Sequence, residues 1–480
     1  MTAPEQNIPT IFAAFGATGD LMRRKVLPAL FYSYKQGELP KMFKVVGFSR
    51  RDWSDEKFQA YVHEVLEEHA KKKLPEAELK PFLSLFKFQR GEFSDPASYQ
   101  NLKQTFDECD KAWGVCSNKL LYLSVAPEFY EIILKEFAAV GLTAPCAPEE
   151  GWNHIIVEKP FGIDLQTAKQ IDELLGKLFS EDQIYRIDHY LAKEMLQNIL
   201  TFRFSNNLFE IPWGNELIES VHIRVLEKIG VEKRGPFYDG VGAFRDVGQN
   251  HLLQMLALVT MEHPETFEAS AIQKKRAEIL EALDIIPEVD MTKATFRAQY
   301  DGYRQIEGVA PDSQTETYFK VRATVSSPKW TGVPIVMESG KRLGRPLKEI
   351  VVTFKHPSPC LCPKNGPHHK NEVIFRMEPR EEILIEFWSK KPGFTFETER
   401  REFSYMLREA TEHVPYVEEY AKLLLDCVRG DQSLFISTEE IRAMWRFTDP
   451  ILEAWQKNIV PLATYKPDTA EALEKAAAIE

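Results

Sequence analysis

Cysteine is scarce in this sequence. It accounts for six of 480 residues, without the even, close spacing of a disulfide framework, which excludes a small secreted disulfide scaffold. No apolar run approaches the ~20 residues needed to cross a bilayer. The opening residues also lack the basic and apolar stretches of a secretory signal. We therefore expect a soluble protein of the cytoplasm that has no membrane partner.

Positive charge is also in deficit. Lys and Arg together number 60 against 72 Asp and Glu, a formal net charge of −12. Because proteins that bind nucleic acids usually carry a basic excess or a basic stripe, we expect no nucleic-acid partner. The chain does contain ample core-forming material, with 44% hydrophobic and 28% charged residues. This composition and length are typical of a globular protein with more than one domain.

The first part of the chain alternates between strand-like and helix-like segments. Short apolar runs predict strands at residues 9–15, 43–48, 85–88, 119–125 and 154–157, and helical spacing covers residues 21–36 and 55–73. This alternation is typical of parallel βαβ units. We therefore predict an α/β domain of the Rossmann type over residues 1–187.

The pattern changes after about residue 188. Alternating segments predict strands at residues 218–226, 315–325, 334–338, 349–355, 372–377 and 382–388, with helices at 241–261, 272–283 and 416–427 and a terminal helix or frayed end at 469–479. Most of these strands have little helix between them, so we predict an α+β domain with a large, mostly antiparallel sheet over residues 188–480.

A glycine-containing turn follows the first predicted strand. It reads Gly16-Ala17-Thr18-Gly19-Asp20-Leu21 and leads into a predicted helix. Such a turn lets the backbone approach a pyrophosphate at a helix N-terminus, although the third glycine of the full dinucleotide fingerprint is missing and a plain tight turn has the same composition. The second strand is followed by Ser49-Arg50-Arg51, where an NAD enzyme would place an acidic residue. Two arginines suit a ribose 2′-phosphate instead, unless Arg50 and Arg51 are solvated loop charges.

Two further motifs lie later in the first part of the chain, the first of them directly after the predicted strand 154–157. Glu158-Lys159-Pro160-Phe161-Gly162 would place the Lys159 ammonium at the carboxyl end of a strand, where open α/β sheets bind ligands; a surface turn is the alternative. Arg186-Ile187-Asp188-His189-Tyr190-Leu191-Ala192-Lys193-Glu194 is interpreted as a helix starting near Asp188. His189 and Lys193 would then lie one turn apart beside Tyr190, forming a site for a phosphate monoester, unless this is an ordinary capped helix.

Two further groups contain histidine. The stretch Arg245-Asp246-Val247-Gly248-Gln249-Asn250-His251 places polar residues at the start of a helix that then becomes apolar, and a buried core histidine is the plainer interpretation of His251. The pair Cys360-x-Cys362 with His368 and His369 has the right chemistry for zinc. Its spacing matches no zinc-finger pattern, so the sequence alone assigns no metal.

Taken together, these motifs resemble the glucose-6-phosphate dehydrogenase family. The resemblance extends through Gly308-Val309, Ser313-Gln314-Thr315-Glu316-Thr317 and Gly332-Val333-Pro334 into Ser339-Gly340-Lys341-Arg342-Leu343. It implies oxidation of glucose 6-phosphate to 6-phosphoglucono-1,5-lactone, which is the entry step of the pentose phosphate pathway. It implies NADP as the cofactor, with NAD as a weaker alternative. It also implies a homodimer or homotetramer built through the large sheet.

The resemblance further implies a role for each matching residue. His251 would be the general base and Asp188 its orienting partner. Glucose 6-phosphate would be held by Lys159, His189, Tyr190, Lys193, Glu227, Asp246 and Lys341. The nicotinamide nucleotide would lie on Gly16, Ala17, Thr18, Gly19, Asp20 and Leu21, with Lys159 touching both ligands, Arg50 at the 2′-phosphate and Glu92 and Phe93 near the adenine.

The sequence departs from the family pattern at two positions. Ala192 replaces a glycine, and because alanine favours helix by up to ~1 kcal/mol over glycine we expect the helix to persist, with the added Cβ crowding the phosphate. Pro346 stands where the family has a second basic substrate contact. The adjacent Arg345 is predicted to take its place.

Overall fold

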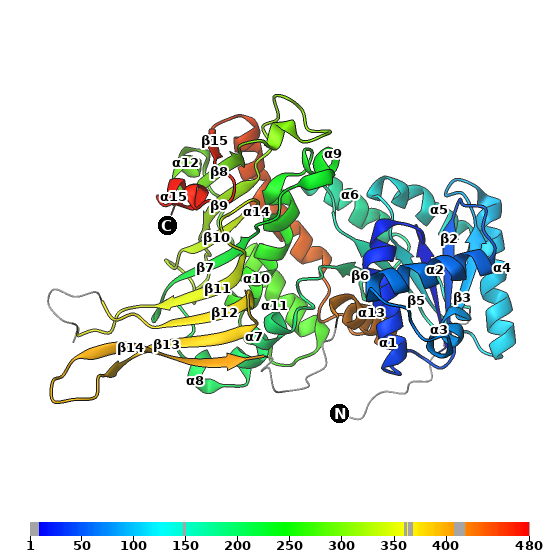
Figure 1. Cartoon of the computed structure of the whole chain (residues 1–480), viewed down its shortest axis with the longest axis horizontal. Coiled ribbons are helices and arrows are strands. Elements are labelled where there is room, and N and C mark those ends of the chain that lie inside the picture. The colour runs from blue at the N-terminus through cyan, green and yellow to red at the C-terminus, as the bar shows by residue number, and fades with distance from the viewer. Residues whose placement is uncertain (1–8, 147–149, 360–361, 363–367, 408–417, 480) are drawn as a thin grey trace. The chain divides into compact units, whose positions relative to one another are not determined.

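The computed structural model describes residues 9–146, 150–359, 362, 368–407 and 418–479 (Figure 1). The chain divides into two compact units. Unit 1 comprises Met1–Ala192, Glu268–Gln273 and Tyr416–Ile441, and unit 2 comprises Lys193–Phe267, Lys274–Pro415 and Arg442–Glu480. The boundary between residues 187 and 188 stays a prediction.

Unit 1 is built on a parallel sheet in the strand order β3-β2-β1-β4-β5-β6. Its strands are β1 (Thr10–Phe15), β2 (Phe43–Ser49), β3 (Phe86–Arg90), β4 (Asn118–Leu123), β5 (Asn153–Glu158) and β6 (Ile184–Ile187). Every residue of β1 is buried, as expected for the central strand of a sheet covered on both faces. The predicted Rossmann-type domain is confirmed, and β6 is a strand that the sequence analysis did not predict.

The helices of unit 1 connect these strands in the βαβ manner, except α13, which the chain contributes after β14. They are η1 (Met22–Val26), α1 (Leu27–Lys35), α2 (Asp55–Ala70), α3 (Glu76–Leu83), α4 (Pro96–Trp113), α5 (Tyr130–Val140), α6 (Leu165–Gly176) and α13 (Glu419–Arg429), with short 3₁₀ turns η2 (Pro127–Phe129) and η3 (Glu181–Gln183). The predicted helix at residues 416–427 corresponds to α13, and residues 416–417 lie outside the described residues.

Unit 2 is built on a mixed sheet in the order β14-β13-β12-β11-β7-β10-β9-β8-β15. Its strands are β7 (Ile218–Leu226), β8 (Thr295–Tyr300), β9 (Tyr318–Ala323), β10 (Ile335–Gly340), β11 (Leu347–Phe354), β12 (Glu372–Glu378), β13 (Glu382–Lys390), β14 (Thr398–Met406) and β15 (Leu462–Tyr465). The pairs β7–β10 and β8–β15 are parallel, and the other neighbouring pairs are antiparallel. The prediction of a large, mostly antiparallel sheet is confirmed.

The helices of unit 2 pack against this sheet, with α7 on β12 and η5 on β7 and β10. They are α7 (Glu194–Phe204), α8 (Asn207–Glu210), α9 (Gly235–Tyr238), η5 (Phe244–Leu252), α10 (Leu253–Thr260), α12 (Met291–Ala294) and α15 (Glu471–Lys475), with 3₁₀ turns η4 (Glu232–Arg234), η6 (Glu288–Asp290) and η7 (Tyr303–Gln305). Helices α11 (Ala269–Glu281) and α14 (Thr438–Gln456) contribute residues to both units. Among the described residues, none of the helices combines the length and apolarity required of a membrane span.

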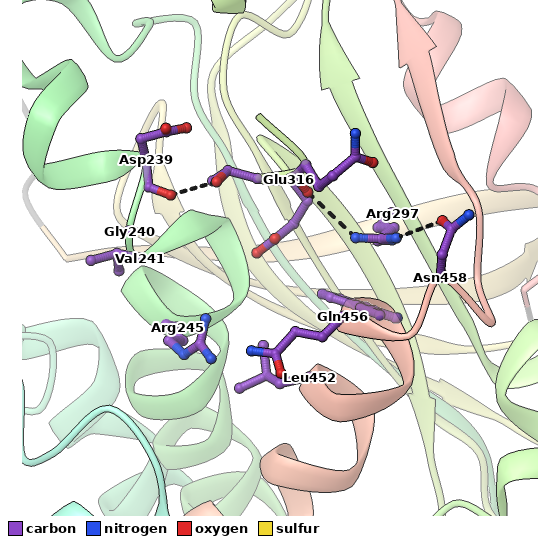
Figure 2. A pocket seen from close by; sticks show the side chains of 12 residues that line it. Asp239, Gly240, Val241, Arg245, Arg297, Glu316, Leu452, Gln456 and Asn458 are labelled. Atoms are coloured by element: carbon purple, nitrogen blue, oxygen red, sulfur yellow. Dashed lines mark hydrogen bonds between the residues drawn. The ribbon is translucent and has the colours of Figure 1, made fainter. Parts of the chain in front are cut away.

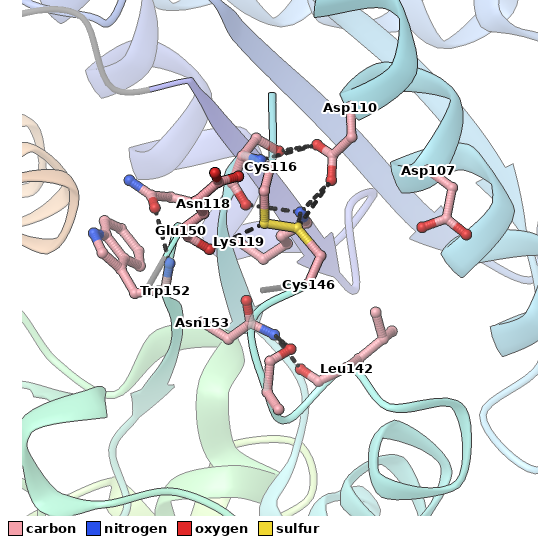
Figure 3. Close-up of a disulfide and its surroundings, with 12 residues drawn as sticks. Asp107, Asp110, Cys116, Asn118, Lys119, Leu142, Cys146, Glu150, Trp152 and Asn153 are labelled. Atoms are coloured by element: carbon pink, nitrogen blue, oxygen red, sulfur yellow. Dashed lines mark hydrogen bonds and ion pairs between the residues drawn. A yellow bond between two sulfur atoms is a disulfide. The ribbon is translucent and has the colours of Figure 1, made fainter. Parts of the chain in front are cut away.

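One disulfide lies in unit 1. Cys116, between α4 and β4, is bonded to Cys146, in the loop after α5 (Figure 3). Beside it, the Nζ of Lys119 lies 2.6 Å from a carboxylate oxygen of Asp110 in a largely buried ion pair. The spacing of 30 residues between the two cysteines gave no signal in the sequence, because neither belongs to a recognisable motif.

Candidate active site

The residues predicted to hold a nucleotide lie at neighbouring strand ends of unit 1. Gly16–Leu21 follows β1, Arg50 follows β2, and Glu92 and Phe93 follow β3. These strands are adjacent and parallel, so their carboxyl ends lie at one edge of the sheet. Open α/β sheets bind ligands at this edge.

The turn after β1 has the geometry that a close ligand approach requires. Gly16 has φ +80°, and a Cβ at this position would collide with the carbonyl oxygen of Ser124. The amide of Gly19 donates to the Gly16 carbonyl at 2.8 Å, and helix begins at Asp20. The free amides of a helix N-terminus therefore follow directly on a glycine turn, an arrangement that suits a phosphate group.

The two arginines after β2 differ in their surroundings. Nε of Arg51 donates to the hydroxyl of Thr18 at 3.1 Å, and its guanidinium lies 4.9 Å from the ring centre of Trp53. Arg50 is exposed. Arg51 therefore contacts the glycine turn and the ring of Trp53. Arg50 remains the candidate for a 2′-phosphate contact.

A buried carboxylate ends β5, one residue before Lys159. Glu158 accepts hydrogen bonds from the hydroxyls of Tyr122 at 2.8 Å and Tyr420 at 3.4 Å. Burial raises the pKa of Glu158 to about 7, although these two donors and the charge of Lys159 oppose the shift. No pattern in the sequence indicates this role of Glu158, because its tyrosine partners are distant in the sequence. Lys159 itself is half-buried at the strand end.

The raised pKa of Glu158 predicts a pH dependence of stability. Because its pKa is raised in the folded state, the neutral carboxyl of Glu158 stabilises the fold. This stabilisation is complete below the ordinary pKa of 4.5 and is lost as the pH rises through about 7. We expect the Tm of the wild type to fall relative to that of Glu158→Gln across this window. Thermal unfolding of both proteins at a series of pH values measures this. A constant Tm difference would contradict the prediction.

The end of β6 corrects one prediction. Residues 186–194 do not form one helix, because β6 ends at Ile187, residues 189–192 form turns, and α7 begins at Glu194. The Asp188 carboxylate accepts from the Tyr190 amide at 2.9 Å, and this local hydrogen bond favours a turn over a helix. His189 and Lys193 therefore do not share a helical face. Ala192 precedes the helix, so its helix propensity does not act there.

The aromatic and acidic residues of this turn lie together. Asp188 is buried, the ring centres of His189 and Tyr190 are 5.0 Å apart, and Tyr190 is also buried. The ring of His189 further stacks near that of Tyr420, 6.4 Å away. The Tyr420 hydroxyl is also a partner of Glu158. The ends of β5 and β6 therefore share one polar cluster.

Arg186 in the same motif has a structural role. Its buried guanidinium donates to Asp172 at 2.7 Å and to Glu181 at 2.6 Å, and it also donates to the Thr438 hydroxyl at 2.8 Å. These bonds fix β6 against the surrounding chain and satisfy the buried charge. The motif thus combines a structural arginine with the candidate ligand contacts after it.

In unit 2 the structure brings together two predicted residues that are distant in the sequence. Leu226 ends β7 and is paired in parallel register with Gly340, which ends β10. Glu227 and Lys341 are the next residues, so they emerge side by side, and the Lys341 Nζ lies 2.6 Å from Glu227 Oε2. Both groups can offer hydrogen bonds to a hydroxylated ligand at this edge. Arg345 lies nearby in sequence and is exposed.

Asp246 and His251 lie on η5, which is a π-helix. His251 is buried and Asp246 is half-buried. π-Helical turns are rare and occur frequently at functional sites, because the wider turn changes the direction of the side chains. The predicted helix in this region is therefore confirmed, but its first part is a π-helix, which the sequence pattern does not indicate.

Glu316 fixes the start of η5. Its Oε1 accepts the Phe244 amide at 2.9 Å, and Gly242, at φ +77°, leaves the space that this carboxylate fills. Burial raises the pKa of Glu316. Sequence reasoning gave this residue no role of its own, although the family resemblance includes it.

A cavity of about 500 Å³ lies next to this point in unit 2 (Figure 2). Asp239, Arg245, Arg297 and Glu316 supply its charged lining. Arg297 donates to Asn458 at 3.0 Å, and Asp239 accepts from Tyr303 at 3.0 Å. The residues predicted for the site do not line this cavity. Arg297 and Asp239 therefore link neighbouring segments of unit 2 by hydrogen bonds.

The predicted site residues are thus distributed over both units. Lys193 is the first residue of unit 2 and the N-cap of α7, and Glu227, Asp246, His251 and Lys341 follow in that unit. Unit 1 carries the nucleotide-type turn, Lys159 and the turn after β6. Within each unit, the candidate residues gather at strand ends or at a helix start.

Comparisons with known proteins agree over most of the chain. Residues 13–198 match the model for the NAD binding domain of glucose-6-phosphate dehydrogenase, and residues 200–480 match the model for its C-terminal domain. A glucose-6-phosphate 1-dehydrogenase of Chlamydia muridarum is 36% identical over 94% of this chain and 91% of its own. Another from Aggregatibacter actinomycetemcomitans is 38% identical over 91% of this chain and 89% of its own.

Two solved structures of glucose-6-phosphate dehydrogenases are also similar to this chain. A glucose-6-phosphate dehydrogenase in complex with glucose 6-phosphate aligns with a TM-score of 0.88 and 32% identity, covering 96% of this chain and 95% of that one. A second, from Mycobacterium avium, aligns with a TM-score of 0.84 and 28% identity over 98% of both chains.

Proposed function

The chain belongs to the glucose-6-phosphate dehydrogenase family of oxidoreductases, and from that premise we propose how its residues bind and oxidise the sugar. The substrate is glucose 6-phosphate, NADP is the hydride acceptor, and His251 is the base that removes the proton from the C1 hydroxyl. The observation that carries this proposal is that the family-matched residues within each unit lie at strand ends or at a helix start.

NADP as the cofactor is supported by the carboxyl edge of the parallel sheet. The Gly16 turn and the helix start at Asp20 fit a pyrophosphate. Arg50 follows β2, where the adenine ribose of a dinucleotide lies in this type of fold. Glu92 and Phe93 follow the next strand and would border the adenine. An arginine at this position favours a 2′-phosphate over a free hydroxyl.

This assignment predicts the effect of Arg50→Ala. Losing a charge-assisted hydrogen bond should raise the KM for NADP roughly 10-fold or more and leave the KM for NAD nearly unchanged. Arg51→Ala is the matched control, since Arg51 contacts Thr18 and Trp53 and should affect both cofactors alike. Steady-state kinetics with each cofactor measures the ratio. An equal loss with NAD and NADP for Arg50→Ala would refute the NADP assignment.

In the proposed reaction, the C1–H bond breaks as its electron pair leaves as hydride, and the hydroxyl proton moves to the His251 imidazole while the C1=O bond forms. A bound nicotinamide supplies the hydride acceptor. An imidazole is a suitable base near neutral pH because its ordinary pKa is about 6.5. Asp188 is proposed to fix the tautomer of His251 and to stabilise the imidazolium that forms.

The other residues position the sugar. We assign the 6-phosphate to His189, Tyr190 and Lys193, whose N–H, O–H and ammonium groups are phosphate donors. Lys159, Glu227, Asp246 and Lys341 would bind the sugar hydroxyls, and Arg345 would add a basic contact. Because the phosphate is remote from C1, its binding energy serves to orient C1 for reaction. Lys159 would also contact the cofactor.

A homodimer or homotetramer is supported by the edge of the unit 2 sheet. Strand β14 exposes Phe403 and Tyr405, which are 65% and 55% accessible, on an edge strand of the sheet. Large exposed aromatic residues on an edge strand favour pairing with another chain. Sedimentation velocity tests this proposal, and a monomer at micromolar concentration would argue against it.

A further inference from the structure

The connection between β11 and β12 gathers three metal-binding side chains. His356 follows β11, and Cys362 and His368 precede β12. The Nε2 of His356 lies 2.9 Å from the Sγ of Cys362, and the rings of His356 and His368 are centred 4.6 Å apart. One potential ligand atom from each of the three residues lies within 4.8 Å of the others.

These separations fit a single small cation. Zinc bound by thiolate and imidazole has Zn–S near 2.3 Å and Zn–N near 2.0–2.1 Å, which places tetrahedral ligand atoms roughly 3.3–3.6 Å apart. The separation of 2.9 Å between His356 Nε2 and Cys362 Sγ is slightly below this range, and all three ligand atoms lie within 4.8 Å of one another. His368 is exposed, so rotation of its side chain can complete the geometry without moving a packed core.

A hydrogen bond from the backbone favours metal binding by the sulfur of Cys362. The backbone amide of His369 donates to the Cys362 Sγ at 3.3 Å, and an amide directed at sulfur stabilises the thiolate that binds metal. The His369 ring stacks on Trp388 at 3.9 Å, and its Nε2 lies 3.2 Å from the Thr398 hydroxyl. His369 therefore anchors the connection to β13 and β14, while the neighbouring His368 belongs to the cluster.

We propose that His356, Cys362 and His368 bind one Zn²⁺ ion, with the fourth coordination position taken by water or another ligand. Binding releases the thiol proton as the Zn–S bond forms. The ion joins His356, which follows β11, to Cys362 and His368, which precede β12, and takes no part in hydride transfer. The mixture of one thiolate and two imidazoles favours zinc over magnesium or calcium, which prefer oxygen ligands.

This revises the expectation from the sequence, which assigned no metal. The earlier grouping contained His368 and His369 and omitted His356, because His356 lies before the cysteines and matches no zinc-finger spacing. Cys360, the other member of that grouping, lies outside the described residues.

The zinc content of the full-length, untagged protein tests this inference, since a polyhistidine tag binds zinc itself. The wild type, Cys362→Ser and His356→Ala are incubated with zinc, passed through gel filtration and analysed by mass spectrometry for metal. His369→Ala is the matched control, because its side chain contacts Trp388 and Thr398 and its backbone amide is retained. We expect about one zinc ion per chain in the wild type and the control. In the two ligand variants we expect at least roughly 10-fold less.

A second readout separates a specific site from surface binding. Replacing zinc with Co²⁺ should give a thiolate-to-cobalt charge-transfer band in the wild type and in His369→Ala, but not in Cys362→Ser. Removing the metal with a chelator should lower the Tm of the wild type and leave that of Cys362→Ser unchanged. A wild type without zinc, or equal zinc in all variants, would overturn the proposal. Glucose 6-phosphate oxidation should persist in Cys362→Ser.

Discussion

Replacing His251 with Asn should lower kcat by at least ~10²-fold with a modest change in KM, because asparagine keeps hydrogen-bonding capacity but cannot accept the proton from the sugar hydroxyl. His251 is buried on the π-helix η5, and asparagine is used because it removes only part of the ring and so leaves a small cavity. Steady-state kinetics with saturating cofactor measures both constants.

The matched control is His263→Asn, the same change at an exposed residue beyond α10. It should retain the activity of the wild type. Circular dichroism and Tm of both variants establish that the fold is intact. If His251→Asn turns over at nearly the wild-type rate, another group is the base.

Replacing Lys193 with Ala should weaken the reaction with glucose 6-phosphate far more than the reaction with free glucose. A charge-assisted hydrogen bond contributes about 1.5–3 kcal/mol, so kcat/KM for the phosphorylated sugar should fall roughly 10- to 100-fold. Free glucose has no phosphate to lose, so its kcat/KM should change little. Comparing both sugars in both proteins gives the ratio of the two effects.

Lys293→Ala is the control for this experiment. Lys293 is an exposed lysine that pairs with Asp290 on the surface, and its side chain is 79% accessible. Its replacement should alter neither reaction. An equal loss with both sugars in Lys193→Ala would show that Lys193 does not bind the phosphate.

The sequence predicted the parallel sheet well because its strands are continuous apolar runs. β1 and β4 are entirely buried, so hydrophobicity alone identifies them. Four strands were missed, and none of them is a long apolar run. In β14 (Thr398–Met406) most residues are exposed and several are charged, β8 includes Arg297 and Gln299, and β6 and β15 are only four residues long, although β6 is entirely buried.

The candidate site was predicted residue by residue, but its geometry was not. The contact between Glu227 and Lys341 depends on the parallel register of β7 and β10, which pairs residues 114 positions apart. Local spacing cannot reveal such a register. The turn at residues 188–192 was wrongly predicted as helix, because Asp188, which follows β6, resembles a helix N-cap in sequence.

The supporting groups were the hardest to predict. Glu158 depends on Tyr122 and Tyr420, and Glu316 on the Phe244 amide, and all of these partners lie far away in the sequence. A buried carboxylate is identified by its surroundings, which the sequence does not state.

The most direct test of the account is the initial rate of reduced-cofactor formation, followed by absorbance, with glucose 6-phosphate and with free glucose at equal concentration and with NADP or NAD. The account predicts rapid NADP reduction with glucose 6-phosphate, a much lower rate with free glucose, and a lower kcat/KM with NAD. Equal rates with both sugars, or no reduction of either cofactor with glucose 6-phosphate, would contradict it.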